Sequence, residues 1–190
     1  MPASIKITKQ QILDISIEIL REHGIDALNV RAICRNLGCT ARPIFRAFGS
    51  MEGLKKELLS RVKEIYIQNL YSPYETTRPF LSLGLNYIRF AVEEKNFFTF
   101  LFMTGQIDIG SPADLISDQW ASLQEEMAET LKISKKDAKT LLLELSILAH
   151  GMAALITQNK IKYEICEIED LFILAFEGIY LVLKSKTKEK

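Results

Sequence analysis

The stretch NVRAICRNLGCTARPIFRAFGS, Asn29 to Ser50, decides the fold of the N-terminal part of the chain. Apolar residues recur at helical spacing on both sides of a central glycine. They are Val30, Ile33, Cys34 and Leu37 before Gly38, and Ile44 and Phe48 after it. Two short helices joined by a glycine-containing turn are typical of a helix-turn-helix. The pattern predicts one helix from Asn29 through Leu37 and a second from Ala41 to Phe48.

Charge is distributed unevenly along a chain whose formal net charge is zero. Residues 1–60 carry nine Lys or Arg and six acids, a net charge of +3, and residues 61–190 carry fifteen and eighteen, a net charge of −3. Between Ala27 and Met51 there are four arginines and no acid. This asymmetry indicates an anionic partner for the N-terminal part. A solvated basic face is the alternative explanation.

The second short helix carries the candidate nucleic-acid contacts. Arg42 and Arg46 lie one turn apart, on the side opposite Ile44 and Phe48. The first helical turn of such a helix can reach base edges in the major groove, where an arginine can bind a guanine or a phosphate. Thr40 is predicted to cap this helix and to offer a hydroxyl to phosphate oxygens. Further backbone contacts are expected from Lys9, Asn29 and Arg31.

Helical periodicity also accounts for the rest of the chain, and no strand pattern is found. An amphipathic helix follows Thr8, its expected cap, and ends at Gly24. A longer helix follows Ser50 and runs from Met51 to Leu70. The remaining predicted helices are Phe80–Glu94, Asn96–Thr104, Pro112–Leu131, Lys135–Asn159 and Glu167–Lys184. The fold class is therefore predicted to be all-α.

Two domains are expected. The segment SPYETTRP, with two prolines in eight residues, is the clearest linker. The helix that begins at Met51 continues out of the compact N-terminal unit, so the change of domain is placed within it. Residues 1–52 form the predicted three-helix domain that contains the helix-turn-helix, and residues 53–190 form the predicted C-terminal helical bundle.

Composition excludes several other classes of protein. The hydrophobic fraction of 48% and the charged fraction of 25% are ordinary for a soluble globular protein. The first residues contain no apolar signal core, and the longest apolar runs are short for a bilayer crossing and interrupted by acids or a histidine. The three cysteines form no CxxC. We therefore expect a cytoplasmic protein with reduced thiols, no metal, no cofactor and no membrane contact.

The run ILDISIEILREHGIDALNVRAICRNLGCTARPIFRAFGSMEGLKKEL resembles the DNA-binding domain of TetR-type bacterial transcriptional regulators. The order of features matches: an amphipathic helix, a glycine, NVRAIC, the turn LGCT, IFRAFGS and then EGL. The run covers about a quarter of the chain. Within the second half, NFFTFLFM and LAHGMAALI resemble segments of one branch of the family. The resemblance implies binding to a double-stranded DNA operator, with Ala41 and Phe45 among the contacts.

Three positions depart from the family pattern. The family usually has a tyrosine, whose hydroxyl meets a phosphate, where Phe45 stands. It usually has a lysine where Met51 stands, and Pro43 is uncommon in that helix. The loss of two backbone partners should weaken non-specific affinity for DNA, since each neutralised phosphate contributes roughly 0.9 to the salt slope.

The resemblance also implies a homodimer formed by the two C-terminal helices and a pocket for a small effector. The sequence independently favours a dimer, because both helices are apolar almost all round and need cover on two sides. The candidate pocket residues are Tyr87, Phe90, Phe98, Phe102, Trp120, His150 and Met152. Ordinary core packing is the alternative for each. The aromatic side chains favour an apolar or aromatic effector. Glu144 and Glu177 also interrupt apolar runs, and solvent, the dimer partner and a ligand remain open for them.

The sequence thus predicts a sequence-specific transcriptional regulator, a repressor that an effector releases from a near-palindromic operator. The main alternative is a ligand-sensing or protein-binding module whose helix-turn-helix no longer reads DNA. An enzyme is not expected, because no paired carboxylates, catalytic triad or phosphate-binding glycine loop is present. The sequence does not separate repression from activation and does not identify the effector, the operator, the regulated genes or the organism.

Overall fold

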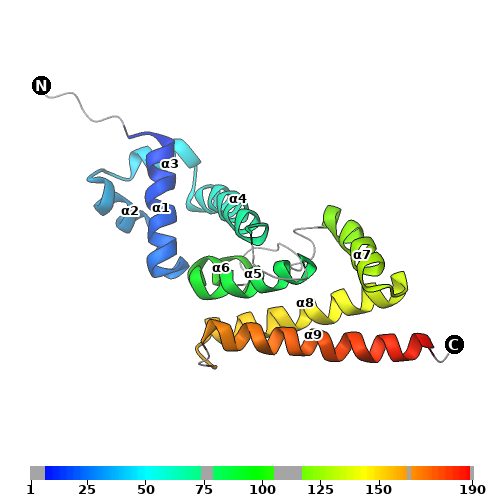
Figure 1. Cartoon of the computed structure of the whole chain (residues 1–190). Helices are drawn as coiled ribbons and strands as arrows, with labels where there is room; N and C mark the ends of the chain where they lie inside the picture. The colour runs from blue at the N-terminus through cyan, green and yellow to red at the C-terminus, as the bar shows by residue number, and fades with distance from the viewer. Residues whose placement is uncertain (1–6, 74–78, 105–116, 162–163, 189–190) are drawn as a thin grey trace, which may run out of the picture. The chain divides into compact units, whose positions relative to one another are not determined.

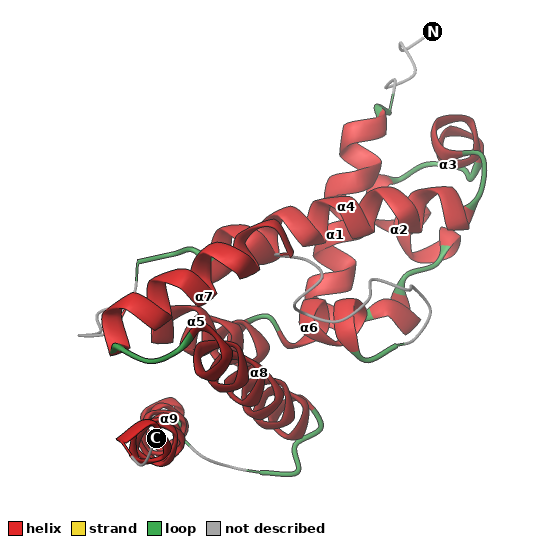
Figure 2. Ribbon diagram, turned by 90° about the vertical axis from the view of Figure 1, so that its right-hand side faces the viewer, coloured by secondary structure: helices red, strands yellow, loops and turns green. Residues whose placement is uncertain are grey.

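The computed structural model describes residues 7–73, 79–104, 117–161 and 164–188. All regular secondary structure within these ranges is helical (Figure 2), which confirms the predicted fold class. The helices are α1 (Lys9–His23), the 3-10 helix η1 (Ile25–Ala27), α2 (Val30–Leu37), α3 (Arg42–Phe48), α4 (Met51–Leu70), α5 (Pro79–Glu93), α6 (Lys95–Phe102), α7 (Ser117–Leu131), α8 (Lys135–Thr157) and α9 (Ile165–Lys188). The predicted helix start at Pro112 lies outside the described residues.

The helices belong to two compact units. The first unit comprises Met1–Ile67 and Glu94–Thr104, and the second comprises Gln68–Glu93 and Gly105–Lys190. The first therefore holds α1, α2, α3, most of α4 and also α6 (Figure 1). These units are defined by packing and not by function, so the predicted functional boundary between residues 52 and 53 stays a prediction.

Aliphatic side chains from α1 to α4 and from the connection after η1 form the core of the first unit. Each is exposed by at most 6%, and they are Ile12, Ile19, Leu28, Ile33, Ile44, Leu54 and Leu58. Burial of this apolar surface fixes α3 against α1 and α4 through Ile44. The predicted inward position of Ile44 is confirmed.

Local capping signals set the ends of these helices. Thr8 caps α1 in a capping box with Gln11, and the side chain of Asn29 accepts a hydrogen bond from the third backbone N–H of α2. Gly38 ends α2 in the left-handed region at φ 61° and ψ 36°, where a side chain is disfavoured. The hydroxyl of Ser50 accepts a hydrogen bond from Gly53 N at 3.0 Å. The predicted cap at Thr8 is therefore confirmed, and Asn29 and Ser50 act in the same way at α2 and α4.

The predicted cap of α3 is wrong. Ala41 is the N-cap residue, no side chain caps the helix, and Thr40 is exposed one position earlier. The carbonyl of Ala41 accepts from Ile44 N at 3.1 Å and from Phe45 N at 3.2 Å. Had Thr40 been the cap, one of the two backbone donors that a capping hydroxyl can use would have been absent, because Pro43 has no N–H.

The segment containing α6 is tied to the end of α1 within the first unit. Arg21 Nε lies 3.0 Å from Glu94 Oε2, and Asn96 Nδ2 donates to Arg21 O at 2.8 Å. The guanidinium of Arg21 also lies 4.9 Å from the centre of the Phe97 ring. Residues from the middle of the chain thus stabilise the last turn of α1.

In the second unit α8 packs against α5, α7 and α9, and α8 and α9 lie side by side (Figure 1). Gly84 of α5 allows close packing with α9, because a Cβ there would lie 2.4 Å from Cζ of Phe172. Ser134 caps α8 by accepting from Asp137 N at 3.1 Å. The buried amide of Asn86 donates to Leu70 O at 3.0 Å and to Ser72 O at 2.9 Å, which fixes the end of α4 to α5.

Candidate nucleic-acid interface

The two faces of α3 differ in chemistry. Ile44 is fully buried, whereas Arg42 and Arg46 are exposed and 45% of the Phe45 side chain is accessible. Within the described residues neither arginine forms a hydrogen bond or an ion pair, so both guanidinium groups point to solvent with their donors unused. A short helix with this surface presents fork-shaped donors that match phosphate or guanine oxygens.

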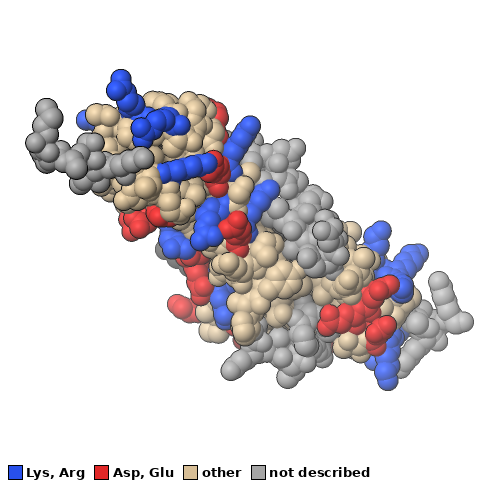
Figure 3. Space-filling view, turned by 90° about the horizontal axis from the view of Figure 1, so that it is seen from above, with Lys and Arg blue, Asp and Glu red and all other residues tan. Residues whose placement is uncertain are grey.

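Positive charge extends from α3 to α2. Arg31 and Arg35, one turn apart on α2, are exposed and make no ion pair within the described part of the chain. Figure 3 shows several Lys and Arg side chains gathered over the surface of the N-terminal helices. Because no acid lies between Ala27 and Met51, nothing in this segment neutralises the arginines locally. Such a surface attracts an anionic partner.

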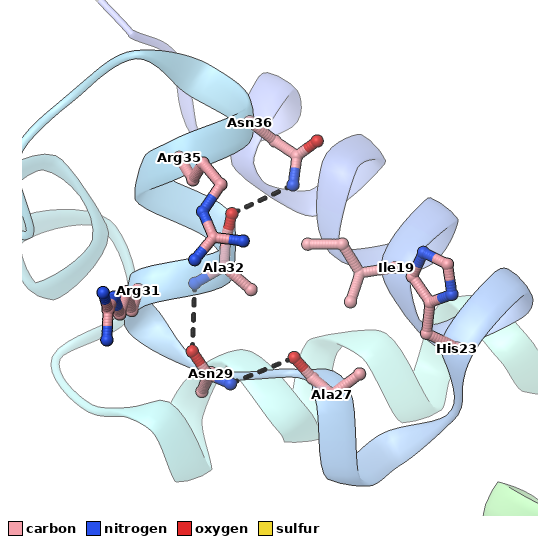
Figure 4. A pocket seen from close by; sticks show the side chains of 8 residues that line it. All are labelled: Ile19, His23, Ala27, Asn29, Arg31, Ala32, Arg35 and Asn36. Atoms are coloured by element: carbon pink, nitrogen blue, oxygen red, sulfur yellow. Dashed lines mark hydrogen bonds between the residues drawn. The ribbon is translucent and has the colours of Figure 1, made fainter.

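A cavity of about 390 Å³ opens beside these arginines. Its lining is Ile19, His23, Ala27, Asn29, Arg31, Ala32, Arg35 and Asn36, with α1 facing α2 across it (Figure 4). No carboxylate is among the lining residues. The sequence analysis did not single out Arg35 or Asn36, although the four-residue spacing from Arg31 to Arg35 was a usable signal.

Asn29 and Lys9 already have protein partners. The Asn29 side chain accepts from Ala32 N at 2.9 Å and donates to Ala27 O at 3.1 Å. Lys9 forms an ion pair with Glu57, and its ammonium lies 5.2 Å from the centre of the Phe48 ring. Their structural roles are thus visible, and the predicted contacts of Asn29 and Lys9 with DNA stay predictions.

The positions that depart from the family pattern differ in their surroundings. Phe45 is exposed on α3 and lacks the hydroxyl of a tyrosine. Met51, in contrast, is partly buried and packs against the core of the first unit. Pro43 lies in the first turn of α3, where a missing N–H leaves no helical hydrogen bond unmade. Met51 contributes apolar packing where a lysine would contribute charge.

Two of the candidate effector residues meet in the second unit. Tyr87 Oη lies 2.7 Å from His150 Nδ1, linking α5 to α8, and Tyr87 is only 5% exposed. Burial lowers the pKa of the His150 imidazole, so the neutral ring is favoured. The pair therefore forms a half-buried polar contact between apolar helices.

The other candidates fall in both units. Phe98 and Phe102 belong to the first unit, where Phe102 meets the Tyr66 ring edge-on at 5.4 Å. In the second unit Phe90 is buried, and Trp120 and Met152 are half-buried. Neither the cavity beside Arg31 and Arg35 nor a shallow one lined by Glu167, Asp170, Leu171 and Leu174 includes any of these residues. An effector pocket at these positions stays a prediction.

A second exposed surface is apolar and lies on α8 and α9. On α8 it comprises Leu143, Ile147, Gly151 and Leu155, each four residues from the next. On α9 it comprises Leu171, Leu174, Gly178, Leu181 and Val182. The exposed fraction reaches 68% at Leu174 and 61% at Ile147. Apolar stripes of this length mark a contact surface.

The helix α8 also has the length and mean hydropathy, 1.7, of a membrane-spanning helix among the described residues. Only 33% of its apolar window is buried in the chain. A core helix of a soluble protein passes the same test, so length and composition alone are weak evidence of a membrane span. Contact with another protein surface would equally explain the exposed apolar face of α8.

Comparisons with known proteins agree with this geometry. Residues 12–58 match the model of a family described as bacterial regulatory proteins, tetR family. A protein of unknown function from Rhodococcus sp. RHA1 has a TM-score of 0.68 at 16% identity, with 96% of this chain and 98% of that chain covered. A TetR-like transcriptional regulator from the same organism has a TM-score of 0.58 at 18% identity, with 95% and 96% covered. No curated protein matches the chain.

The geometry and the structural matches define a helix-turn-helix protein with a TetR-like fold. Residues 12–58 are similar to the tetR family of bacterial regulatory proteins, so the resemblance predicted from the sequence of this run is confirmed. Regulators of this family bind DNA, typically dimerise and are generally not enzymes.

Proposed function

We propose that the chain is a homodimeric, sequence-specific DNA-binding repressor that a small effector releases from its operator. The observation that carries the proposal is the exposed face of α3, where Arg42 and Arg46 lie one turn apart without partners in the described residues. Arg42 is at the first position of the helix, where recognition helices contact base edges. Thr40, Ala41 and Phe45 flank this arginine pair.

Backbone phosphates are the proposed partners of α2. Arg31 and the N-terminal end of α2 supply positive charge, and the capping by Asn29 fixes where that end lies. Lys9 joins this surface only after it leaves Glu57, so its contribution is expected to be smaller. These contacts position the protein on DNA and carry no sequence information.

A second copy of this chain is the proposed cover for the exposed faces of α8 and α9. The leucines and isoleucines at three- and four-residue spacing suit packing against another helix. Gly151 and Gly178 lie in the middle of these faces with open space beside them, so a partner helix can approach closely there. A two-fold dimer presents two copies of α3, which favours a near-palindromic operator.

The effector is proposed to be apolar or aromatic and to bind in the second unit near Tyr87 and His150. It can change operator affinity only through a different affinity for the DNA-binding and released states. The helix α4 begins in the DNA-binding part and ends at Leu70, beside the Asn86 amide. A shift of this end of α4 is the proposed route by which effector binding alters the spacing of the two α3 helices.

A helix-turn-helix that no longer reads sequence is the second candidate, favoured by Phe45 and Met51. Fluorescence anisotropy separates the two. Binding is measured on a DNA duplex taken from immediately upstream of the chain's own coding region. A duplex of scrambled sequence serves as the competitor, and the measurement is repeated across a salt series. Preferential binding to the upstream duplex supports a sequence-reading regulator. Equal, weak and salt-sensitive binding to both supports the second candidate or an operator elsewhere.

A further inference from the structure

Two thiols lie together at the turn between α2 and α3. Cys34 opens the last turn of α2, and Cys39 follows the left-handed Gly38. The carbonyl of Cys34 accepts from Gly38 N and from Cys39 N, the latter at 3.1 Å. This helix-ending arrangement brings the residue after the glycine back against the residue five positions earlier. The Cys34 side chain is accordingly close enough to affect the pKa of the Cys39 thiol, and both residues are half-buried.

In helix ends of this kind, the two residues that correspond to Cys34 and Cys39 usually make an apolar contact. A pair of thiols can in addition be oxidised to a disulfide. A disulfide requires the two sulfurs to approach to about 2.05 Å with their residues side by side. The hydrogen bond from Cys39 N to Cys34 O already holds the two residues next to each other, so we expect a disulfide to form without unwinding of α2. The only charged residues between Ala27 and Met51 are arginines, and positive charge nearby stabilises a thiolate.

We propose that Cys34 and Cys39 are a thiol-oxidation site, that a hydroperoxide converts them to a disulfide, and that this weakens DNA binding. The effect on DNA rests on the proposed function, whereas the disulfide itself does not. One thiolate attacks the peroxide, the O–O bond breaks, and an alcohol or water leaves with a proton. The resulting sulfenic acid is attacked by the second thiol, and water leaves as the S–S bond forms. In total the two thiols lose two protons and two electrons, which reduce the hydroperoxide.

The roles of the two sulfurs differ. Burial and the neighbouring Cys34 raise the pKa of the Cys39 thiol, so its thiolate is disfavoured. The first attack is therefore assigned to Cys34, and Cys39 closes the disulfide. A dithiol reductant reverses the reaction by exchange.

The bond acts on DNA binding through the start of α3. Cys39 is two residues before Ala41, the N-cap of α3, and no side chain holds that cap in place. Drawing Cys39 toward α2 moves the entry of α3 and with it Arg42. Loss of one bidentate arginine–base contact weakens binding about tenfold or more, and this is the expected effect of oxidation.

The test uses the full-length protein with Cys166→Ser, which removes the exposed third thiol on α9. Hydrogen peroxide is the probe. The reduced and treated proteins are compared by free-thiol titration, by a non-reducing peptide map and by anisotropy on the upstream duplex. Cys39→Val keeps an apolar side chain against Cys34 and removes the second thiol. Circular dichroism checks that each variant is folded.

The inference predicts a linkage between Cys34 and Cys39, loss of both free thiols, weaker DNA binding by about tenfold or more and recovery with dithiothreitol. In Cys39→Val, peroxide should give no disulfide and no reversible loss of DNA binding. Absence of the linkage in a protein that binds DNA would overturn the inference, and so would a linkage that leaves affinity unchanged. If the disulfide forms but the reduced protein does not bind DNA, the proposed function is contradicted and the proposed oxidation site is still supported.

Discussion

The Nε atom of Arg21 lies 3.0 Å from Oε2 of Glu94, a residue 73 positions further along the chain. This ion pair connects the last turn of α1 to the residue that precedes α6. Arg21 also covers the Phe97 ring and accepts through its carbonyl from Asn96. The first unit is therefore completed by residues 94–104, which lie far along the chain from its N-terminal helices.

Removal of Arg21 should destabilise the protein more than removal of the Glu94 charge. Glu94→Gln keeps the shape and loses the ion pair, which contributes up to about 1 kcal/mol because Arg21 is half exposed. Arg21→Ala also uncovers Phe97. Urea denaturation of both variants tests this order. Arg61→Ala, in an exposed pair with Glu64 on a single helix, is the matched control and should change stability little. Equal effects of all three substitutions would contradict the role given to Arg21.

Asn29→Ala should lower the free energy of unfolding by about 1 kcal/mol, because the backbone N–H of Ala32 loses its acceptor. Asn29→Ser keeps a capping oxygen and should retain most of the stability. Denaturant unfolding measures both, and anisotropy on DNA is run in parallel. Weaker DNA binding by a fully stable Asn29→Ser variant would reveal a direct contact of the amide with DNA. An Asn29→Ala protein as stable as the parent would rule out the capping role.

Gly84→Ala should destabilise the second unit by about 1–3 kcal/mol, because the added Cβ overlaps the Phe172 ring. Gly151→Ala meets open space within one chain. In the proposed dimer it should instead raise the dissociation constant, measured by analytical ultracentrifugation, while thermal unfolding of the monomer is unchanged or improved. If neither Gly151→Ala nor Ile147→Glu changes the dissociation constant of the dimer, the subunit contact lies elsewhere.

His150 gives stability a defined dependence on pH. Its folded-state pKa is lowered by burial, so between that pKa and the ordinary value of about 6.5 the unfolded chain binds more protons. The contribution of the neutral ring is fully present above pH of about 6.5 and is lost as the pH falls through that range. The melting temperature of the wild type should therefore drop more than that of His150→Gln between pH 7 and pH 5. His23→Gln, at an exposed position, should follow the wild type. Parallel curves for all three proteins would contradict this account.

Helix ends that depend on residues close in sequence could be predicted. Helices begin or end through hydrogen bonds or backbone angles within a few positions at Thr8, Asn29, Gly38, Ser50 and Ser134, and these residue types are ones that favour such ends. The error at Thr40 also has a local cause, because Pro43 removes one of the two N–H groups that a capping hydroxyl can use. A prediction of helix caps from residue type alone misses such a case, because it does not check whether the residues two and three positions later have a backbone N–H.

Contacts between distant residues were not predictable from one sequence. Lys9 with Glu57 and Arg21 with Glu94 join positions whose spacing carries no periodic signal. Tyr87 and His150 were both candidate residues, yet only the packing of α5 against α8 brings them within 2.7 Å. The proximity of Cys34 and Cys39 also depends on the left-handed conformation of Gly38.

Arg42→Ala on DNA tests the central claim most directly. Anisotropy is measured for wild type and Arg42→Ala on the upstream duplex and on a scrambled duplex across a salt series. Lys160→Ala, which removes the same charge at an exposed position after α8, is the control. The account predicts that Arg42→Ala loses about 1–3 kcal/mol of binding to the upstream duplex and most of its preference over the scrambled one, while Lys160→Ala keeps both. Unchanged preference in Arg42→Ala would contradict the assignment of α3 as the recognition helix.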